Sequence, residues 1–338
     1  MREASTYLVR LIVTNAVRYA GKTDIGKRRQ SNQDHFLVAD LGRSLRLAAT
    51  SLDVDPHSLL FGSPLGHLFL VADGMGGHQA GNRASELAIN YFVGSVLNSL
   101  RWIHRPDSES EKRFLAELKE TLSAAHLAIV ADSKTQSSFE GMGTTLTMAY
   151  VAWPKMWIVH AGDTRCYLLR NMQLQLLTRD HTLANQMASQ GIYQADVSER
   201  SPWANVLWNA LGAGAAEVEA EICDLALQIG DRILLCSDGL NKHVTDSEIE
   251  SILNRDDPPE ATCQALIDLA NEGGGSDNIS AIVADILQPR ARDLITTVAK
   301  PPTEESIFHD LTNYSHSEGE TTTDDSGTVD PNDTIDLE

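Results

Sequence analysis

The stretch HLFLVADGMGGHQAG, residues 67–81, joins an apolar run to an acid and a group of glycines. The part HLFLVA has the composition of a buried β-strand, and this run ends at Asp73. Burying a carboxylate costs free energy unless the charge is neutralised, and the glycines that follow allow a sharp turn but weaken regular structure. A core strand that ends in this way indicates that the acid has a purpose beyond folding.

The same pattern returns further along the chain. Asp163 follows the run MWIVHAG, Asp238 follows RILLCS, and Asp277 stands shortly before ISAIVADI. In antiparallel sheets the end of one strand lies beside the start of its neighbour, so these acids and Asp73 can share one edge. Crowded carboxylates resist ionisation unless a cation neutralises them, and oxygen ligands favour Mg²⁺ or Mn²⁺. A simple turn is the alternative for each Asp-Gly pair alone.

A basic segment upstream adds a second kind of chemistry. GKRRQSNQDHFLVAD places Arg29 five residues before Asp34, which stands at the start of another apolar strand. An arginine fork suits a phosphate dianion, and a neighbouring acid suits a metal site, although a solvated basic turn explains KRR equally well. His78, in the glycine loop, is either an ordinary loop histidine or a proton donor near neutral pH.

Composition and charge exclude several classes of function. The chain has 338 residues and a formal net charge of -20, so it lacks the basic surface that nucleic-acid binding requires. Four widely spaced cysteines fit neither a disulfide framework nor a CxxC metal site. No apolar run approaches the ~20 residues that span a bilayer. We expect a cytoplasmic protein with neither a nucleic-acid nor a membrane partner.

Two amphipathic helices are predicted in the first half, over 82–100 and over 111–131. The apolar face of the first is expected to consist of Leu87, Tyr91, Val96 and Leu100. The face of the second is expected to consist of Phe114, Leu118, Leu122, Ala125 and Ile129.

Short apolar runs separated by turn residues predict a second half rich in strands. Thr245 and Glu248 form a capping box before one further helix, and residues 258–275 predict another, with Pro at its start and Gly at its end. Helices therefore alternate with groups of strands. This pattern favours an α+β fold in which antiparallel sheets are covered by helix pairs.

Eight motifs stand in a characteristic order: RRQSNQD, VADGMGGHQAG, GMGTTLTMAYV, HAGDTRCYLLRN, LTRDHT, NALG, DRILLCSDGL and GGSDNISAIVADI. In this order they resemble metal-dependent serine/threonine protein phosphatases of the type 2C family, and DGMGGH is similar to the bacterial branch. The resemblance covers about residues 16–288. It implies a four-layer α-β-β-α sandwich with two central antiparallel β-sheets flanked by helix pairs.

The resemblance also implies a centre of two Mn²⁺ or Mg²⁺ ions and a water, bridging the two ions, that attacks phosphorus. By motif position, Asp73 bridges both ions, the Gly74 carbonyl binds one, and Asp238 and Asp277 complete the protein ligands of the other. Asp34 supports these ligands through water.

The other roles follow from the same resemblance. Arg29 would hold the substrate phosphate, and His78 stands where a general acid for the departing serine or threonine oxygen could lie. Asp163 corresponds to a ligand of a third, weaker ion.

The chain departs from the family pattern in three places. Gln33 stands where many members have Glu, and VLWNALG lacks the usual Arg before Leu-Gly. Lys242, four residues after Asp238, stands where many members place an Asp near the third ion. We expect a third ion to bind weakly or not at all, and the two-metal centre to remain.

These observations predict a phosphatase domain over 16–290 with an insertion at 41–66, preceded by an N-terminal extension over 1–15. Residues 291–338 are expected to form a disordered, acidic tail. The expected activity is hydrolysis of phosphoserine and phosphothreonine in proteins by a monomer that opposes a bacterial Ser/Thr kinase. The alternatives are a noncatalytic phosphoprotein-binding module on the same fold and a metallohydrolase of small phosphate esters.

Overall fold

The computed structural model describes residues 17–42, 44–46, 48, 59–61, 65–98, 108–192, 201–288 and 297–299. The extension expected over 1–15 and most of the tail expected over 291–338 lie outside these residues. The chain divides into a main unit, Met1–Ser44 with Phe61–Thr296, and a small unit, Leu45–Leu60 with Thr297–Glu338.

Two antiparallel sheets form the centre of the main unit. One sheet contains, in spatial order, β1 (Val17–Asp24), β14 (Ile279–Ile286), β13 (Arg232–Cys236), β9 (Arg165–Arg170) and β10 (Gln173–Leu176). The other contains β11 (Leu211–Gly212), β6 (Gly143–Thr144), β5 (Gly66–Met75), β7 (Leu146–Ala152), β8 (Lys155–Ala161) and β12 (Glu221–Ala226). In this second sheet, β2 (Asp34–Leu41) also pairs with β5.

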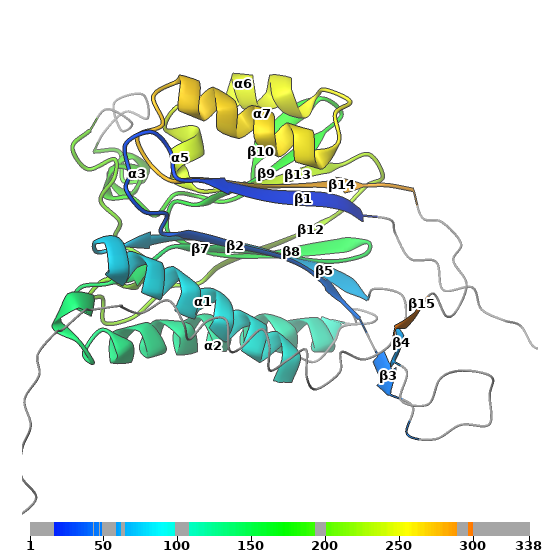
Figure 1. Cartoon of the computed structure of the whole chain (residues 1–338), viewed down its shortest axis with the longest axis horizontal. Helices are drawn as coiled ribbons and strands as arrows, with labels where there is room; N and C mark the ends of the chain where they lie inside the picture. Colours follow the sequence, from blue (N-terminus) through cyan, green and yellow to red (C-terminus); the bar gives the residue numbers. More distant parts are fainter. Residues whose placement is uncertain are drawn as a thin grey trace, which may run out of the picture. The chain divides into compact units, whose positions relative to one another are not determined.

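Helices cover the outer face of each sheet (Figure 1). On the second sheet lie α1 (His78–Asn98) and α2 (Ser108–Asp132), and on the first lie α6 (Asp246–Leu253) and α7 (Pro259–Glu272). The shorter helices are η1 (Ser137–Phe139), α3 (Leu183–Ser189) and α5 (Asp238–Asn241). The α+β fold with four layers that the sequence predicts is confirmed.

The central strands β5 and β14 are largely apolar because both of their faces are buried over most of their length. On β5, Leu68 and Leu70 point into the core beneath α1 and α2, whereas Phe69 and Val71 point into the core between the two sheets. On β14 the alternation repeats, and its other face contacts the core beneath α5, α6 and α7. Side chains of a strand alternate between its two faces, so one strand sequence supplies two cores at once.

The helices lie at the predicted positions, but the apolar face predicted for α1 is partly wrong. The predicted apolar face of α2 is buried at every position, Phe114, Leu118, Leu122, Ala125 and Ile129. On α1, however, Tyr91 is 42% exposed, and the buried positions include Ala84, Ala88 and Phe92. Small alanines let this helix approach β5 closely, and a search for large apolar residues overlooks them. The last predicted face residue, Leu100, lies outside the described residues.

The helix ends follow their local sequence. The side chain of Thr245 accepts a hydrogen bond from the backbone of Glu248, and the Glu248 side chain accepts one from the backbone of Thr245. This reciprocal capping box starts α6 as the sequence predicts. Pro259 stands in the first turn of α7, where its missing N–H leaves no hydrogen bond unmade.

A three-stranded sheet has the order β15 (Thr297–Ala299), β4 (Leu59–Phe61) and β3 (Ser44–Arg46). Its residues belong to the small unit except Ser44 and Phe61, which are counted with the main unit. The insertion expected over 41–66 therefore includes two short strands. β15 lies within the range expected to be disordered, so the expectation fails for these three residues, which pair with β4. Within the described residues, no helix is both long and apolar enough to span a membrane.

Arg232 and Arg18 bind the same buried carboxylate, and their burial predicts unequal contributions to stability. Arg232 is buried, pairs with Asp285 at 2.6 Å, and also donates to the carbonyl oxygens of Leu253, Arg255 and Asp257. Arg18 pairs with Asp285 at 2.8 Å, but its side chain is 48% exposed. We expect Arg232→Ala to lower the free energy of unfolding by about 3–5 kcal/mol. Arg18→Ala should cost less than about 1 kcal/mol.

Urea denaturation of the two variants and the wild type measures this difference. Equal losses for both substitutions would contradict the assignment of Arg232 as the buried partner.

Candidate metal centre

Five carboxylates gather at one end of the two sheets, and they are called the acidic cluster here: Asp34, Asp73, Asp163, Asp238 and Asp277. Antiparallel pairing brings them together, because the start of β2, the end of β5 and the loop after β8 meet the end of β13 and the start of β14. All except Asp34 line a cleft of about 790 Å³, together with Arg29 and Lys242. The structure thus brings together the acids that the sequence selects.

Asp34 and Asp73 face each other directly, because the register of β2 and β5 pairs them across the two strands. Like charges at opposite positions of an antiparallel pair destabilise the sheet. Asp73 lies inside β5 rather than at its end, since Gly74 and Met75 continue the strand by pairing with β6. The sequence expectation that the strand ends at Asp73 is therefore wrong, because β5 continues to Met75.

Asp34 is buried among polar groups that supply hydrogen bonds to only one of its two carboxylate oxygens. Ser237 and Ser280 donate hydrogen bonds to its Oδ2 at 2.7 and 2.8 Å. Its Oδ1 is buried and has no hydrogen-bond partner among the described residues. Burial, together with the charges of Asp238 and Asp277, raises the pKa of Asp34 to about 6, although the hydrogen bonds from the two serine hydroxyls lower this pKa. Among the described residues, one oxygen of this buried carboxylate is thus left without a hydrogen-bond partner.

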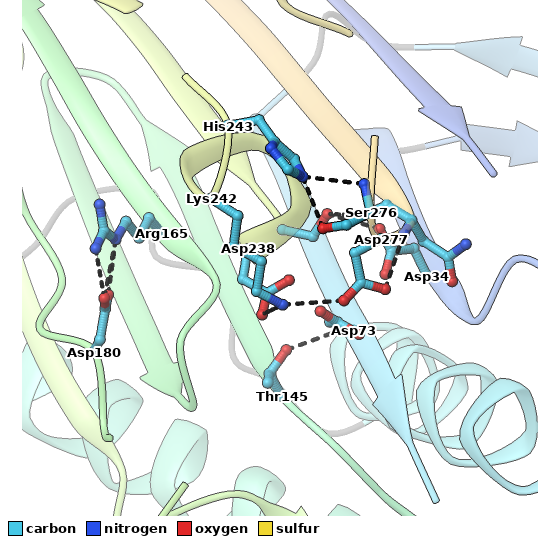
Figure 2. Close-up of polar contacts among 12 residues, drawn as sticks. Asp34, Asp73, Thr145, Arg165, Asp180, Asp238, Lys242, His243, Ser276 and Asp277 are labelled. Carbon is cyan, nitrogen blue, oxygen red and sulfur yellow. Dashed lines mark hydrogen bonds and ion pairs between the residues drawn. The ribbon is translucent and has the colours of Figure 1, made fainter. Parts of the chain in front are cut away.

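The backbone of Asp73 is held from the neighbouring loop. Its N–H donates to Thr145 Oγ1 at 3.0 Å, and its carbonyl accepts from the Thr145 N–H at 2.9 Å (Figure 2). The hydroxyl of Thr144 donates to the same carbonyl at 2.9 Å. Burial, followed by the charges of the other acids in the cluster, raises the pKa of Asp73 well above its ordinary value. The fold therefore fixes this carboxylate where it is hardest to ionise without a cation.

Asp163 is positioned through a buried histidine to which the sequence analysis gives no role. The N–H of Gly162 donates to His181 Nδ1 at 3.2 Å, and Asn209 Nδ2 lies 2.9 Å from the same nitrogen. Because Nδ1 accepts, the proton must be on Nε2, which faces Glu221 at 3.1 Å. Burial and then neighbouring carboxylates raise the pKa of Asp163. A lone histidine in LTRDHT carries no sequence signal for this support.

Asp238 and Asp277 are paired with cationic side chains. Lys242 Nζ lies 2.5 Å from Asp238 Oδ2 and 3.0 Å from Asp277 Oδ2 (Figure 2). Arg29 Nε lies 2.7 Å from Asp277 Oδ1, and its Nη2 donates to Oδ2 at 2.9 Å. Burial alone would raise the pKa of Asp277, but Arg29 and Lys242 outweigh burial and lower it. Asp238 Oδ1 is buried and, among the described residues, has no hydrogen-bond partner.

The glycines of the opening stretch allow backbone segments to meet behind Asp73. A Cβ on Gly74 would collide with the carbonyl oxygen of Gly81, and a Cβ on Gly81 would collide with the side chain of Gln33. Gly76 and Gly77 have φ angles of 113° and 96°, which favour glycine. These close contacts place the first turn of α1 directly against β5, the strand that contains Asp73.

Gln33 makes contacts that the Glu expected here from the family resemblance could not make. Its amide faces the backbone carbonyls of Gly74 at 3.1 Å and Gly77 at 3.3 Å, so the amide nitrogen is assigned to this side, where it donates to both. A carboxylate has no proton to donate there. The Gly74 carbonyl, expected from the resemblance to bind an ion, thus also accepts from Gln33.

His78 is the candidate residue that the structure leaves undecided. It begins α1, four residues earlier than the predicted helix, and its side chain lies outside what the structure describes. Its proposed role as a general acid stays a prediction.

The donor set of the cluster fits a hard divalent cation. It offers carboxylate oxygens, and Asp34 Oδ1 and Asp238 Oδ1 are buried without partners among the described residues. In the described part of the chain, no group of three or more Asp, Glu, His or Cys side chains already has the geometry that holds a metal. Asp238 and Asp277 instead face Lys242 and Arg29. An ion could be bound once these carboxylates exchange their ion pairs for it.

The sequence matches the Protein phosphatase 2C family over residues 55–284. It is 34% identical over 277 residues to the serine/threonine protein phosphatase PstP of Mycobacterium tuberculosis, covering 81% of this chain and 46% of PstP. It is 34% identical over 218 residues to the serine/threonine phosphatase stp of Listeria monocytogenes, covering 64% of this chain and 84% of stp. The chain thus spans about half the length of PstP.

The fold is similar to that of a crystal structure of the catalytic domain of PstP in complex with two manganese ions. The TM-score is 0.62 at 31% sequence identity, and the match covers 81% of this chain and 100% of that chain.

The raised pKa of Asp34 predicts that this carboxylate destabilises the metal-free protein. Its pKa in the folded state, about 6, lies above the ordinary value of 3.8, so folding favours the protonated form. The penalty is absent below the ordinary pKa and grows as the pH rises through the folded pKa. At neutral pH, in EDTA, we expect Asp34→Asn to stabilise the protein by up to about 3 kcal/mol.

The matched control is Asp231→Asn, because Asp231 is equally buried but pairs with Arg170 at 2.6 Å. This control should lower the melting temperature, whereas Asp34→Asn should raise it. A lower melting temperature for both variants in EDTA would show that Asp34 is not an unfavourable charge.

Proposed function

The chain belongs to the protein phosphatase 2C family, and we propose that it hydrolyses phosphoserine and phosphothreonine in proteins with two bound Mn²⁺ or Mg²⁺ ions. The observation that carries this proposal is the acidic cluster, whose carboxylates except Asp34 line one cleft beside a partly exposed arginine. A cluster of this kind needs cations, and a phosphate ester is a substrate on which both the cations and the arginine can act.

Four residues would hold the two ions. Asp73 lies centrally and would contact both ions, the Gly74 carbonyl would bind one of them, and Asp238 with Asp277 would bind the other. Two such ions supply a water of lowered pKa and neutralise charge on the phosphoryl oxygens. Asp34, behind Asp73, would orient water on these ligands through its unpartnered Oδ1.

Arg29 would bind the phosphoryl group of the substrate. Its side chain is 47% exposed at the cleft, and its guanidinium already binds a carboxylate in a bidentate manner, which is the geometry it would use for a phosphate dianion. His78, at the start of α1 beside the glycine loop, would protonate the departing serine or threonine oxygen.

A third ion should bind weakly or not at all. Asp163 would be its ligand, but the ammonium of Lys242 acts electrostatically on Asp163 and occupies the side of the site where a second acid would be needed. A positive charge in that place disfavours a further cation.

The names of the relatives indicate the class of substrate and no individual substrate protein. PstP and stp are serine/threonine phosphatases by name, and this chain would likewise act on phosphorylated proteins, opposing a Ser/Thr kinase. The alternative of a noncatalytic phosphoprotein-binding module is favoured by one observation, the pairing of Asp238 and Asp277 with Lys242. Turnover with added metal separates the two.

Release of phosphate from a phosphothreonine peptide tests the proposal. We expect release with Mn²⁺, none with EDTA, and a higher kcat/KM for the peptide than for p-nitrophenyl phosphate. Asp238→Asn should keep the fold but lower kcat by about 100-fold or more, because one ligand charge is lost. The exposed control Asp256→Asn should match the wild type.

Absence of turnover with Mn²⁺ would leave the binding module as the better explanation. A higher kcat/KM for the small ester would favour the small-ester hydrolase.

Arg29→Ala should raise KM for the phosphopeptide about tenfold with a smaller change in kcat, since a phosphate contact is lost while the ligand carboxylates remain. Arg28→Ala is the matched control, because its side chain is an exposed neighbour in the same segment. Steady-state kinetics of both variants measures the effect. A lower kcat at unchanged KM would instead assign Arg29 to the transition state.

A further inference from the structure

Lys242 makes two ion pairs in the cleft that the family resemblance does not predict. Asp238 begins α5 and Lys242 follows its last residue, so the two side chains stand one helical turn apart on one face. The ammonium lies 2.5 Å from Asp238 Oδ2 and 3.0 Å from Asp277 Oδ2, and the side chain is 27% exposed (Figure 2). Lys242 therefore points into the site and joins two segments that are far apart in the sequence.

The two oxygens that face Lys242 belong to the carboxylates proposed as ligands of one ion. Mg²⁺ binds carboxylate oxygens at about 2.0–2.1 Å and demands near-ideal octahedral geometry. An ammonium group at hydrogen-bonding distance from the same oxygens leaves no room for such an ion between them. The ammonium and the ion therefore compete for one position.

We propose that Lys242 is a built-in counter-cation of the metal centre, which holds Asp238 and Asp277 in the metal-free protein and must withdraw before both can ligate the ion. This inference rests on the two-metal site of the proposed function. It assigns Lys242 a positioning role, since it acts through the two carboxylates.

The charge balance of the cleft explains why such a cation is needed. The carboxylates of the acidic cluster repel one another, and Arg29 reaches only Asp277 among them. Lys242 contacts both Asp238 and Asp277 and also acts on Asp163. Without it, buried Asp238 would lose its ion pair in the metal-free protein, and an unpaired buried charge is strongly destabilising.

Withdrawal of the ammonium is sterically simple. Lys242 lines the cleft of about 790 Å³, so space lies next to its side chain. Its flexible four-carbon stem can carry the ammonium away without movement of α5. The wild type should thus bind the ion more weakly than a chain with a neutral residue at this position.

Mn²⁺ binding and thermal stability of Lys242→Met test the proposal without any turnover. Methionine has a similar length and no charge. We expect the variant to bind Mn²⁺ about tenfold more tightly by calorimetry, because no ion pair has to be broken. In EDTA its melting temperature should be lower by roughly 5 °C, and Mn²⁺ should raise it by more than in the wild type.

Two further variants control for charge and for the substitution itself. Lys242→Arg keeps a cation and should bind Mn²⁺ nearly as weakly as the wild type. Lys119→Met removes an exposed lysine of α2 and should change neither quantity. Equal or weaker Mn²⁺ binding by Lys242→Met than by the wild type would overturn the proposal.

Acetylation of the wild type gives a second measurement that does not depend on a folded variant. With acetic anhydride and mass spectrometry, labelling of Lys242 should rise when Mn²⁺ is added, while labelling of Lys119 stays constant. Unchanged labelling of Lys242 at saturating Mn²⁺ would show that the ammonium does not withdraw.

The result also separates this inference from the proposed function. Tighter Mn²⁺ binding by Lys242→Met without phosphatase activity in any variant would support the counter-cation and refute the phosphatase. Mn²⁺ binding by neither protein would refute both.

Discussion

Repulsion among the carboxylates of the acidic cluster is the constraint on which the rest of this site depends. Asp34 and Asp73 are paired across β2 and β5, and Asp238 and Asp277 act on both. Each neighbouring feature reduces this repulsion or holds the acids against it. Ser237 and Ser280 donate to Asp34, Thr145 fixes the backbone of Asp73, and two cationic side chains bind the outer acids. The two sheets supply the rigidity that such an arrangement requires.

That rigidity comes from strands that belong to two cores at once. The side chains of β5 alternate between the core beneath α1 and α2 and the core between the sheets, so the strand cannot shift by one residue without exchanging both sets. The register that pairs Asp34 with Asp73 is therefore fixed by apolar packing elsewhere along the same strands. Packing energy in the cores keeps charges together that would separate if the strands were free to slide.

Much of the fold could be predicted from the sequence because its signals are local. Continuous apolar runs, the capping box at Thr245 and the acids near strand ends are all visible in short windows. The start of α1 is not visible in this way. Gly81 suggests a loop, but it lies within α1, where the absence of a side chain lets the helix approach Gly74 closely. The support of Asp163 by His181 depends on a contact between separate loops, and no short pattern encodes such a contact. The Asp238–Lys242 spacing did hold a usable signal, since oppositely charged residues four apart in a helix face each other.

Under the proposed function, Asp277 would connect metal binding with substrate recognition, because among the described residues it is the carboxylate that both Arg29 and Lys242 bind. In the metal-free protein its oxygens are shared between Arg29 and Lys242, so neither cation is free for another anion. An ion bound to these oxygens would weaken both pairs at once. Under the proposed function, the guanidinium of Arg29 then gains freedom to bind a phosphate dianion in the same cleft. Under the proposed function, the metal would therefore bind first and the phosphate second, since the phosphate would otherwise compete with Asp277 for Arg29.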